Sequence, residues 1–281
     1  ILTLVLFVVA YPLYWVIISS ISAPSAVSSG KVLLHPIGFT LKGYAEVFKN
    51  DQVMRGFLNS LIITFCGVMV NLIVTLPTSY ALSRSNFSGK KPITIFYLIT
   101  MFFGGGLIPT YLVIQRLQML NTIWALILPG CLSVYNMIVA RTFFKSNISE
   151  ELYEAAEIDG CTQARFFFQI ALPLSKAIIA ILVLYYGVGH WNSYFSALVY
   201  ISDKAKYPLQ LVLRNILITN QTALSQTATT AAARAALQEK QQLIDVMKYS
   251  LIIISSIPVL VMYPLVQKHF VKGVMIGSMK G

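Results

Sequence analysis

The sequence predicts an all-α integral membrane protein with six transmembrane helices. Hydrophobic residues make up 57% of the chain and charged residues only 11%, compared with about 25% charged in an ordinary soluble domain. The charges are also bunched, so that long windows of the sequence contain none. Each of six such windows holds about 20 apolar residues, the length that crosses the hydrocarbon core of a bilayer.

The six spans are expected within one transmembrane domain that covers residues 1–281. A charge at mid-membrane costs about 2.5–3.5 kcal/mol on insertion scales, so six charge-free windows do not arise by accident. A further charge-free window, Asn215 to Ala233, is rejected as a span because its second half consists largely of Asn, Gln, Ser, Thr and Ala. The expected spans are about 1–21, 56–82, 92–115, 117–140, 177–202 and 249–267.

The first span begins at Ile1 within an apolar run that has no Met and no basic flank. We therefore expect the natural chain to have residues before it. A signal peptide cleaved near Ala23 to Ala26 is the weaker alternative, since such a peptide is a short apolar run that ends in small residues.

The loop from Arg84 to Lys91 predicts the orientation. It carries three basic residues and no acidic residue, and short basic loops stay in the cytoplasm. With this loop inside, residues 141–176 and both termini are cytoplasmic, and residues 22–55, the tight turn near Arg116 and residues 203–248 are outside. Ten basic residues then lie inside and eleven outside, so the orientation depends on this loop and not on the overall charge.

No pattern in the sequence predicts catalysis or metal binding. Cys66 and Cys131 fall within spans and Cys161 in a polar loop, an odd number at unrelated depths that argues against a disulfide framework and a metal cluster. The spans contain no paired carboxylates, no metal-spaced His cluster and no nucleophile with its base, as a membrane enzyme would require. We expect no catalytic residue, no metal site and no enzyme activity in this chain.

The connection at residues 146–173 predicts a helix, a glycine turn and a second helix. Ser149 is placed to cap the first helix, and Glu150 and Glu151 stand in its first turn, where the helix dipole favours acids. Gly160 can supply the positive φ that ends it. The first helix brings four residues onto neighbouring faces, with the two alanines as a flat strip that another protein can approach closely: Leu152, Ala155, Ala156 and Asp159.

The second half of this connection is expected to tie that helix to the membrane bundle. Its apolar residues are predicted to pack against the spans, and Pro173 ends it before the next one. The packing residues are Phe166, Phe167, Ile170 and Leu172.

At these positions the chain resembles the binding-protein-dependent permeases of ABC importers. Their cytoplasmic signature reads E-A-A, three residues, G, nine residues, then I-x-L-P, and Glu154-Ala155-Ala156, Gly160 and Ile170-Ala171-Leu172-Pro173 match it. The segment also lies between the fourth and fifth predicted spans, as in that family. Two small departures are Cys161, where such permeases often have Ala, and Ser149, where many have Pro.

The resemblance extends over nearly the whole chain and is greatest to the complex-carbohydrate branch related to the maltose permease subunits, of LplC type. It implies a type I ABC importer permease core with a cytoplasmic coupling helix. The stretches that carry it are Gly105-Gly106-Leu107-Ile108-Pro109-Thr110-Tyr111, Leu120-Asn121-Thr122-Ile123-Trp124-Ala125, Gly189-His190-Trp191-Asn192-Ser193 and Phe270-Val271-Lys272-Gly273-Val274-Met275-Ile276-Gly277.

The resemblance also implies the partners. It predicts a heterodimer with a second permease, two ATPase subunits below it, and an extracellular or periplasmic solute-binding protein, all at a bacterial cytoplasmic (inner) membrane. The chain has no phosphate-binding loop, so ATP and Mg²⁺ belong to the ATPase subunits and the chain itself has no cofactor. Membrane lipid surrounds the spans, and no nucleic-acid partner is expected.

Coupling to the ATPase subunits is assigned by the same resemblance. Glu154 is expected to anchor the ATPase subunit, Ala155 and Ala156 to form the contact surface, and Gly160 to make the turn. The full set expected to take part in coupling is Glu154, Ala155, Ala156, Asp159, Gly160, Leu172 and Pro173.

A sugar path needs aromatic rings that stack on pyranose rings and amides that bond hydroxyl groups. Tyr185, Tyr186 and His190 are further polar or aromatic residues in this region, and His190 is interpreted as structural. Trp and Tyr also anchor membrane interfaces, which is the alternative role of each aromatic residue. The candidates for the substrate path are Tyr135, Asn136, Trp191, Asn192 and Tyr194.

The outer loop 203–248 is long, and Thr222 to Ala236 is expected to form a helix or hairpin, with a disordered surface loop as the alternative. By resemblance it reaches into the binding protein, with Thr222, Ser225 and Thr227 as contact candidates.

The outer side carries eleven basic and five acidic residues, a net charge of +6. This charge favours either an anionic solute, such as a uronate oligosaccharide of the alginate or pectin type, or an acidic binding protein. An importer for a peptide or an amino acid is the remaining alternative, because the coupling signature is shared by all these importers.

Overall fold

The computed structural model describes residues 2–223 and 231–278, and the regular elements in these residues are all helices. Contacts divide the chain into two compact units. Unit 1 comprises Ile1–Ser60 and Ala197–Leu260, and unit 2 comprises Leu61–Ser196 and Val261–Gly281.

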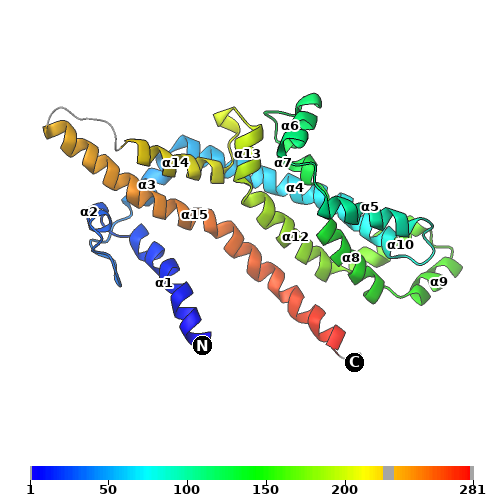
Figure 1. Ribbon diagram of the computed structural model, residues 1–281. Coiled ribbons are helices and arrows are strands. Elements are labelled where there is room, and N and C mark those ends of the chain that lie inside the picture. The colour runs from blue at the N-terminus through cyan, green and yellow to red at the C-terminus, as the bar shows by residue number, and fades with distance from the viewer. Residues whose placement is uncertain (1, 224–230, 279–281) are drawn as a thin grey trace. The chain divides into compact units, whose positions relative to one another are not determined.

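Figure 1 shows the helices, coloured and labelled in chain order. They are α1 (Leu2–Ser20), α2 (Pro24–Ser28), α3 (Lys42–Lys49), α4 (Asp51–Ser83), α5 (Lys90–Phe102), α6 (Leu107–Arg116), α7 (Trp124–Ile127), η1 (Leu128–Gly130), α8 (Val134–Asn147), α9 (Glu150–Ile158), α10 (Gln163–Phe166), η2 (Phe167–Ala171), α11 (Leu172–Leu174), α12 (Lys176–Trp191), α13 (Tyr194–Tyr200), η3 (Lys204–Lys206), α14 (Leu209–Ala223) and α15 (Ala231–Ser278).

Unit 1 is held together by a small apolar cluster between α1, α2 and α15. Ile18, Val32 and Val246 are buried in it, and the ring of Trp15 meets that of Tyr249 edge-on at 5.1 Å. The start of α14 is fixed to α4 because the Ser60 hydroxyl accepts a hydrogen bond from the backbone N–H of Leu209 (2.8 Å).

Three helices are long and apolar enough to cross a membrane as single rods: α1, α4 and the part of α15 from Gln241 to Pro264. Three further spans arise if each bent helix pair counts as one, which brings the total to six. The expected spans 1–21 and 56–82 fall on α1 and α4, although α4 begins earlier, at Asp51.

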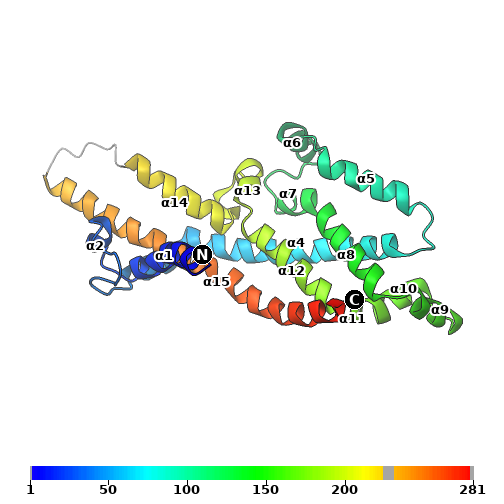
Figure 2. The same ribbon diagram turned by 60° about the horizontal axis from the view of Figure 1, so that its bottom comes forward.

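The span expected at 92–115 is broken into two helices. Three consecutive glycines, Gly104–Gly106, separate α5 from α6, and the two helices are bent by 113° (Figure 2). Glycine destabilises a helix because it exposes the backbone and loses the most conformational freedom on ordering. The mean hydropathy of a sequence window shows that the segment is apolar, but it does not show a break in the helix.

The spans expected at 117–140 and 177–202 are also interrupted. Residues 117–123 form turns, with positive φ at Gln118 and Asn121, and a 52° bend separates Trp124–Gly130 from α8, which continues to Asn147. In the later window α12 ends at Trp191 and α13 begins at Tyr194.

The segment expected as an outer loop at 203–248 is largely helical, and the apolar span that follows it, expected at 249–267, lies at Gln241–Pro264. The helix α15 runs without interruption from Ala231 to Ser278, and α14 fills Leu209–Ala223. Ala, Gln, Glu and Lys are good helix formers, and Lys248 pairs with Asp245 one turn earlier at 3.2 Å. Thr222 therefore belongs to α14, whereas Ser225 and Thr227 lie outside the described residues.

Candidate functional site

The coupling segment 146–173 has the local structure that its sequence predicts. The Ser149 hydroxyl accepts a hydrogen bond from the backbone N–H of Leu152 (3.3 Å) and caps α9. At the other end Gly160 has φ +76°. Its N–H bonds to the carbonyl of Glu157, and the N–H of Cys161 bonds to the carbonyl of Ala156 (2.9 Å), which together form a Schellman motif.

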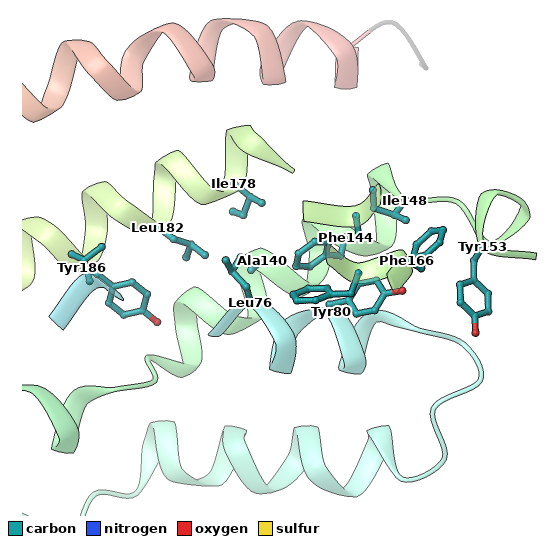
Figure 3. Close-up of a cluster of buried hydrophobic side chains, with 13 residues drawn as sticks. Leu76, Tyr80, Ala140, Phe144, Ile148, Tyr153, Phe166, Ile178, Leu182 and Tyr186 are labelled. Carbon is teal, nitrogen blue, oxygen red and sulfur yellow. The ribbon is translucent and has the colours of Figure 1, made fainter. Parts of the chain in front are cut away.

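An aromatic cluster attaches α9 to the rest of unit 2 (Figure 3). Tyr153 is the buried residue of α9, 6% exposed, and its ring meets that of Phe166 edge-on at 5.3 Å. Phe166 is completely buried and packs with Tyr80 and Phe144, which come from α4 and α8. Residues 163–174, which we call the return segment, therefore hold α9 through this aromatic cluster. This agrees with the packing role expected for Phe166 and Phe167.

The outward surface of α9 differs from the flat pair of alanines that the sequence predicts. Successive residues of a helix point about 100° apart. Ala155 is exposed, while Ala156 packs against the aromatic cluster. Glu154 and Asp159 are exposed, and Ile158, an apolar residue that the sequence did not single out, is 87% exposed on the same helix.

Gly160 lies at the edge of this surface, whereas Leu172 and Pro173 do not belong to it. Leu172 is partly buried against the aromatic cluster, and Pro173 is exposed in the first turn of α11. Both residues end the return segment before the 80° bend into α12.

A polar hollow of about 320 Å³ lies in unit 2 between the start of α8 and the face of α12. It offers hydrogen-bonding groups and aromatic rings together. Its lining residues are Gly130, Ser133, Asn136, Tyr185, Tyr186, Gly189 and His190.

Buried polar side chains of α4 form hydrogen bonds to residues that line this hollow. The Asn71 amide donates to the carbonyl of Gly130 (2.8 Å), and its oxygen lies 2.7 Å from Nε2 of His190. The Thr75 hydroxyl lies 2.7 Å from the hydroxyl of Tyr186. A side chain at Gly67 would overlap the imidazole, so α4 and α12 approach closely here.

The residues predicted for the substrate path do not converge. Asn136 lines the hollow, but Tyr135 and Tyr194 are exposed elsewhere. Trp191 is packed inside the unit with 2% exposed. Asn192 follows the last turn of α12, and its amide donates to the carbonyl of Val188, four residues earlier (3.0 Å).

Asn71 and Thr75 were missed, although the sequence holds a signal for Asn71. An amide within a charge-free span needs a partner inside the protein, which is the argument that applies to Asn136. The partner of Asn71 is His190, 119 positions away, and the sequence does not reveal that pairing.

The second hollow, of about 550 Å³, lies in unit 1. Lys204 and Arg214 line it together with amides and Tyr207, and neither Asp nor Glu is among the described residues that form its wall. Its lining is Asn50, Gln52, Lys204, Tyr207, Val212, Arg214, Asn215, Ile216, Ile218, Ile244 and Met247.

Comparison with known proteins decides what this architecture is. Residues 36–276 match the family model of the binding-protein-dependent transport system inner membrane component. The chain belongs to this family. It is an inner-membrane permease, a multi-pass all-α domain with the type I ABC importer fold and a coupling helix, as the sequence predicts.

Relatives of this permease match it over almost its whole length. It is 37% identical to the polygalacturonan/rhamnogalacturonan transport system permease protein YtcP of Bacillus subtilis, over 96% of this chain and 92% of YtcP. It is 39% identical to Protein LplC of the same organism, over 96% of this chain and 89% of LplC.

A solved structure has the same fold. It is the crystal structure of a bacterial ABC transporter involved in the import of the acidic polysaccharide alginate, and the chain matches it with a TM-score of 0.85 and 28% identity. The match covers 96% of this chain and 93% of that one.

Proposed function

We propose that this permease forms one half of the membrane pore of an ATP-driven importer for an acidic oligosaccharide. The observation that carries the proposal is the 37% identity, along 96% of the chain, to a permease named for polygalacturonan and rhamnogalacturonan. The structural match to an importer of alginate, another acidic polysaccharide, points to the same class of solute. These relatives favour a carbohydrate over the peptide or amino acid that the coupling signature alone left open.

The partners follow from the mechanism of such importers. A solute-binding protein delivers the oligosaccharide, a second permease completes the pore, and two ATPase subunits bind ATP and Mg²⁺ and dock on the coupling helices. Closure of the ATPase subunits moves the coupling helices as rigid bodies and switches the pore between its two states. The loop at Arg84 and both termini then lie on the cytoplasmic side.

Two hollows supply candidate contacts for the oligosaccharide. The hollow between α8 and α12 offers the amide of Asn136, the ring of Tyr185 and the imidazole of His190, groups suited to sugar hydroxyls and ring faces. The hollow of unit 1, which we place on the outer side, adds the positive charges of Lys204 and Arg214. Positive charge at an entrance raises the local concentration of an anionic solute.

A thermal-shift screen of the cognate binding protein tests the proposal. Oligogalacturonates and oligoalginates are expected to raise its melting temperature, while neutral galacto-oligosaccharides of the same length are expected to leave it unchanged. If only neutral sugars stabilise the binding protein, the acidic cargo is wrong. If only peptides or amino acids do, the carbohydrate assignment is wrong as well.

A further inference from the structure

The side chain of Arg84, directly after the last turn of α4, is enclosed by groups from α4, α9 and α10. Its Nη2 lies 2.6 Å from a carboxylate oxygen of Glu150, the first residue of α9. The guanidinium carbon lies 4.3 Å from the ring centroid of Tyr153, 5.8 Å from that of Tyr80 and 6.0 Å from that of Phe166. Only 12% of the arginine side chain is exposed.

This arrangement differs from an ordinary surface ion pair. Exposed pairs contribute little, because water screens them and two flexible side chains must be ordered. Here the guanidinium is largely buried, its bond to Glu150 is short and charge-assisted, and the face of Tyr153 attracts the cation. Removal of Glu150, whose side chain is 42% exposed, leaves the largely buried guanidinium without its carboxylate partner.

Backbone contacts strengthen the same junction. The Glu150 carboxylate also accepts a hydrogen bond from the N–H of Ser85 (3.1 Å). The Lys90 ammonium donates to the carbonyls of Arg84 (3.1 Å) and Ser85 (2.9 Å), and Nε of Arg141 donates to the carbonyl of Leu82 (2.9 Å). The end of α4 and the loop after it are therefore fixed to the start of α9 through Glu150, to α5 through Lys90 and to α8 through Arg141.

The other end of this connection is the polar hollow. Arg84 follows Asn71 by 13 positions, which corresponds to roughly 20 Å at the rise of an α-helix. Asn71 and Thr75 of α4 hold His190 and Tyr186 of the hollow by hydrogen bonds. One helix thus joins the ion pair at α9 to the residues that shape the hollow.

We propose that Arg84 is the positioning residue through which displacement of the coupling helix α9 is transmitted along α4 to the polar hollow. Arg84 itself belongs neither to the exposed residues of α9 nor to the residues that line the hollow. The proposal rests on the proposed function only in requiring that α9 docks on an ATPase subunit. It does not depend on which solute is carried.

The test uses a reporter in the hollow that needs no solute. Gly189 lines the hollow and has room for a side chain, because no other atom lies within 4 Å of a Cβ at this position. Gly189→Cys, in a chain whose Cys66, Cys131 and Cys161 are replaced by Ala, is introduced into the complete four-subunit complex in nanodiscs. Its rate of thiol labelling is compared without nucleotide and after trapping with ATP and vanadate.

With Arg84 present, trapping is expected to change the labelling rate at least fivefold. With Arg84→Gln, the change is expected to fall below twofold, while the ATPase subunits still co-purify and still hydrolyse ATP. Lys91→Gln is the matched control, since Lys91 belongs to the same basic loop, is exposed and forms no ion pair with the described residues. This control is expected to retain the full change.

Two further variants separate transmission from simple loss of folding. Arg84→Lys keeps the charge for Glu150 but not the planar stacking on Tyr153, so an intermediate change is expected. The exchange Arg84→Glu with Glu150→Arg is expected to restore part of what either single variant loses. A full labelling change in Arg84→Gln overturns the inference, and so does a parallel loss of the labelling change and of ATPase co-purification in every variant with a substitution at Arg84.

Failure of the proposed function has a different signature. In that case the Gly189→Cys complex with Arg84 intact shows the nucleotide-dependent change in labelling, but no oligosaccharide-loaded binding protein stimulates its ATP hydrolysis.

Discussion

The turn at Gly160 permits a graded test of the coupling segment. Its φ of +76° lies in the left-handed region, and a Cβ there would meet no other atom within 4 Å. The cost of a substitution is therefore backbone strain and not a clash. For an ordinary L-residue this strain is about 1–2 kcal/mol, which corresponds to a factor of roughly 5–30 against the turn. Asn tolerates this conformation better, and a β-branched residue tolerates it less well.

Three substitutions at position 160 distinguish an effect of backbone strain from an effect of the added side chain on docking of the ATPase subunit. Uptake into cells is expected to decrease in the order wild type, Gly160→Asn, Gly160→Ala, Gly160→Val, with little transport left for Val. Immunoblots of the membrane fraction are expected to show equal permease, because the strain is local. Unchanged uptake with Val would refute the role of this turn. An equal and complete loss with all three residues would show that docking needs the empty space at position 160 and not its backbone conformation.

Three further predictions concern the anchor of α9 and the two hollows. Tyr153→Ala is expected to cost about 3–5 kcal/mol of packing and to release the ATPase subunits on purification, while Tyr153→Phe keeps the ring and the complex; equal retention with Ala would contradict the anchor. Asn71→Leu leaves the buried hydrogen-bond partners of Asn71 unpaired, which costs about 1–3 kcal/mol of stability, so a lower melting temperature and lower uptake are expected. Asn192→Leu loses one local hydrogen bond and is expected to be nearly neutral. Equal effects of the two would argue against the network behind the hollow. Lys204→Ala with Arg214→Ala is expected to weaken stimulation of ATP hydrolysis by acidic oligosaccharides about tenfold at low salt and less at high salt; no change would exclude the unit 1 hollow from solute attraction.

The sequence predicts the coupling segment well because its determinants are local. A cap at Ser149, acids in the first turn and Gly160 at the end act within one or two turns of helix, and the structure has each of them. The number of spans could be predicted for a similar reason, since apolar length alone decides whether a segment can cross a bilayer.

Breaks and tertiary pairs could not be predicted in the same way. The bend between α5 and α6 and the early start of α15 at Ala231 depend on helix geometry, which a count of charges does not report. The basic loop at Arg84 predicted orientation, yet Arg84 also pairs with Glu150, 66 positions away. Such pairings are set by tertiary packing, and neither the residue types nor their positions in the sequence identify the two partners.

The most direct test of the central claim is stimulation of ATP hydrolysis in the reconstituted importer. The complex of both permeases and both ATPase subunits is placed in nanodiscs with its binding protein, and an acidic and a neutral oligosaccharide of equal length are compared. The account predicts that oligogalacturonate or oligoalginate stimulates hydrolysis and that neutral galacto-oligosaccharide does not. Stimulation by the neutral sugar alone, or by neither sugar, would contradict it.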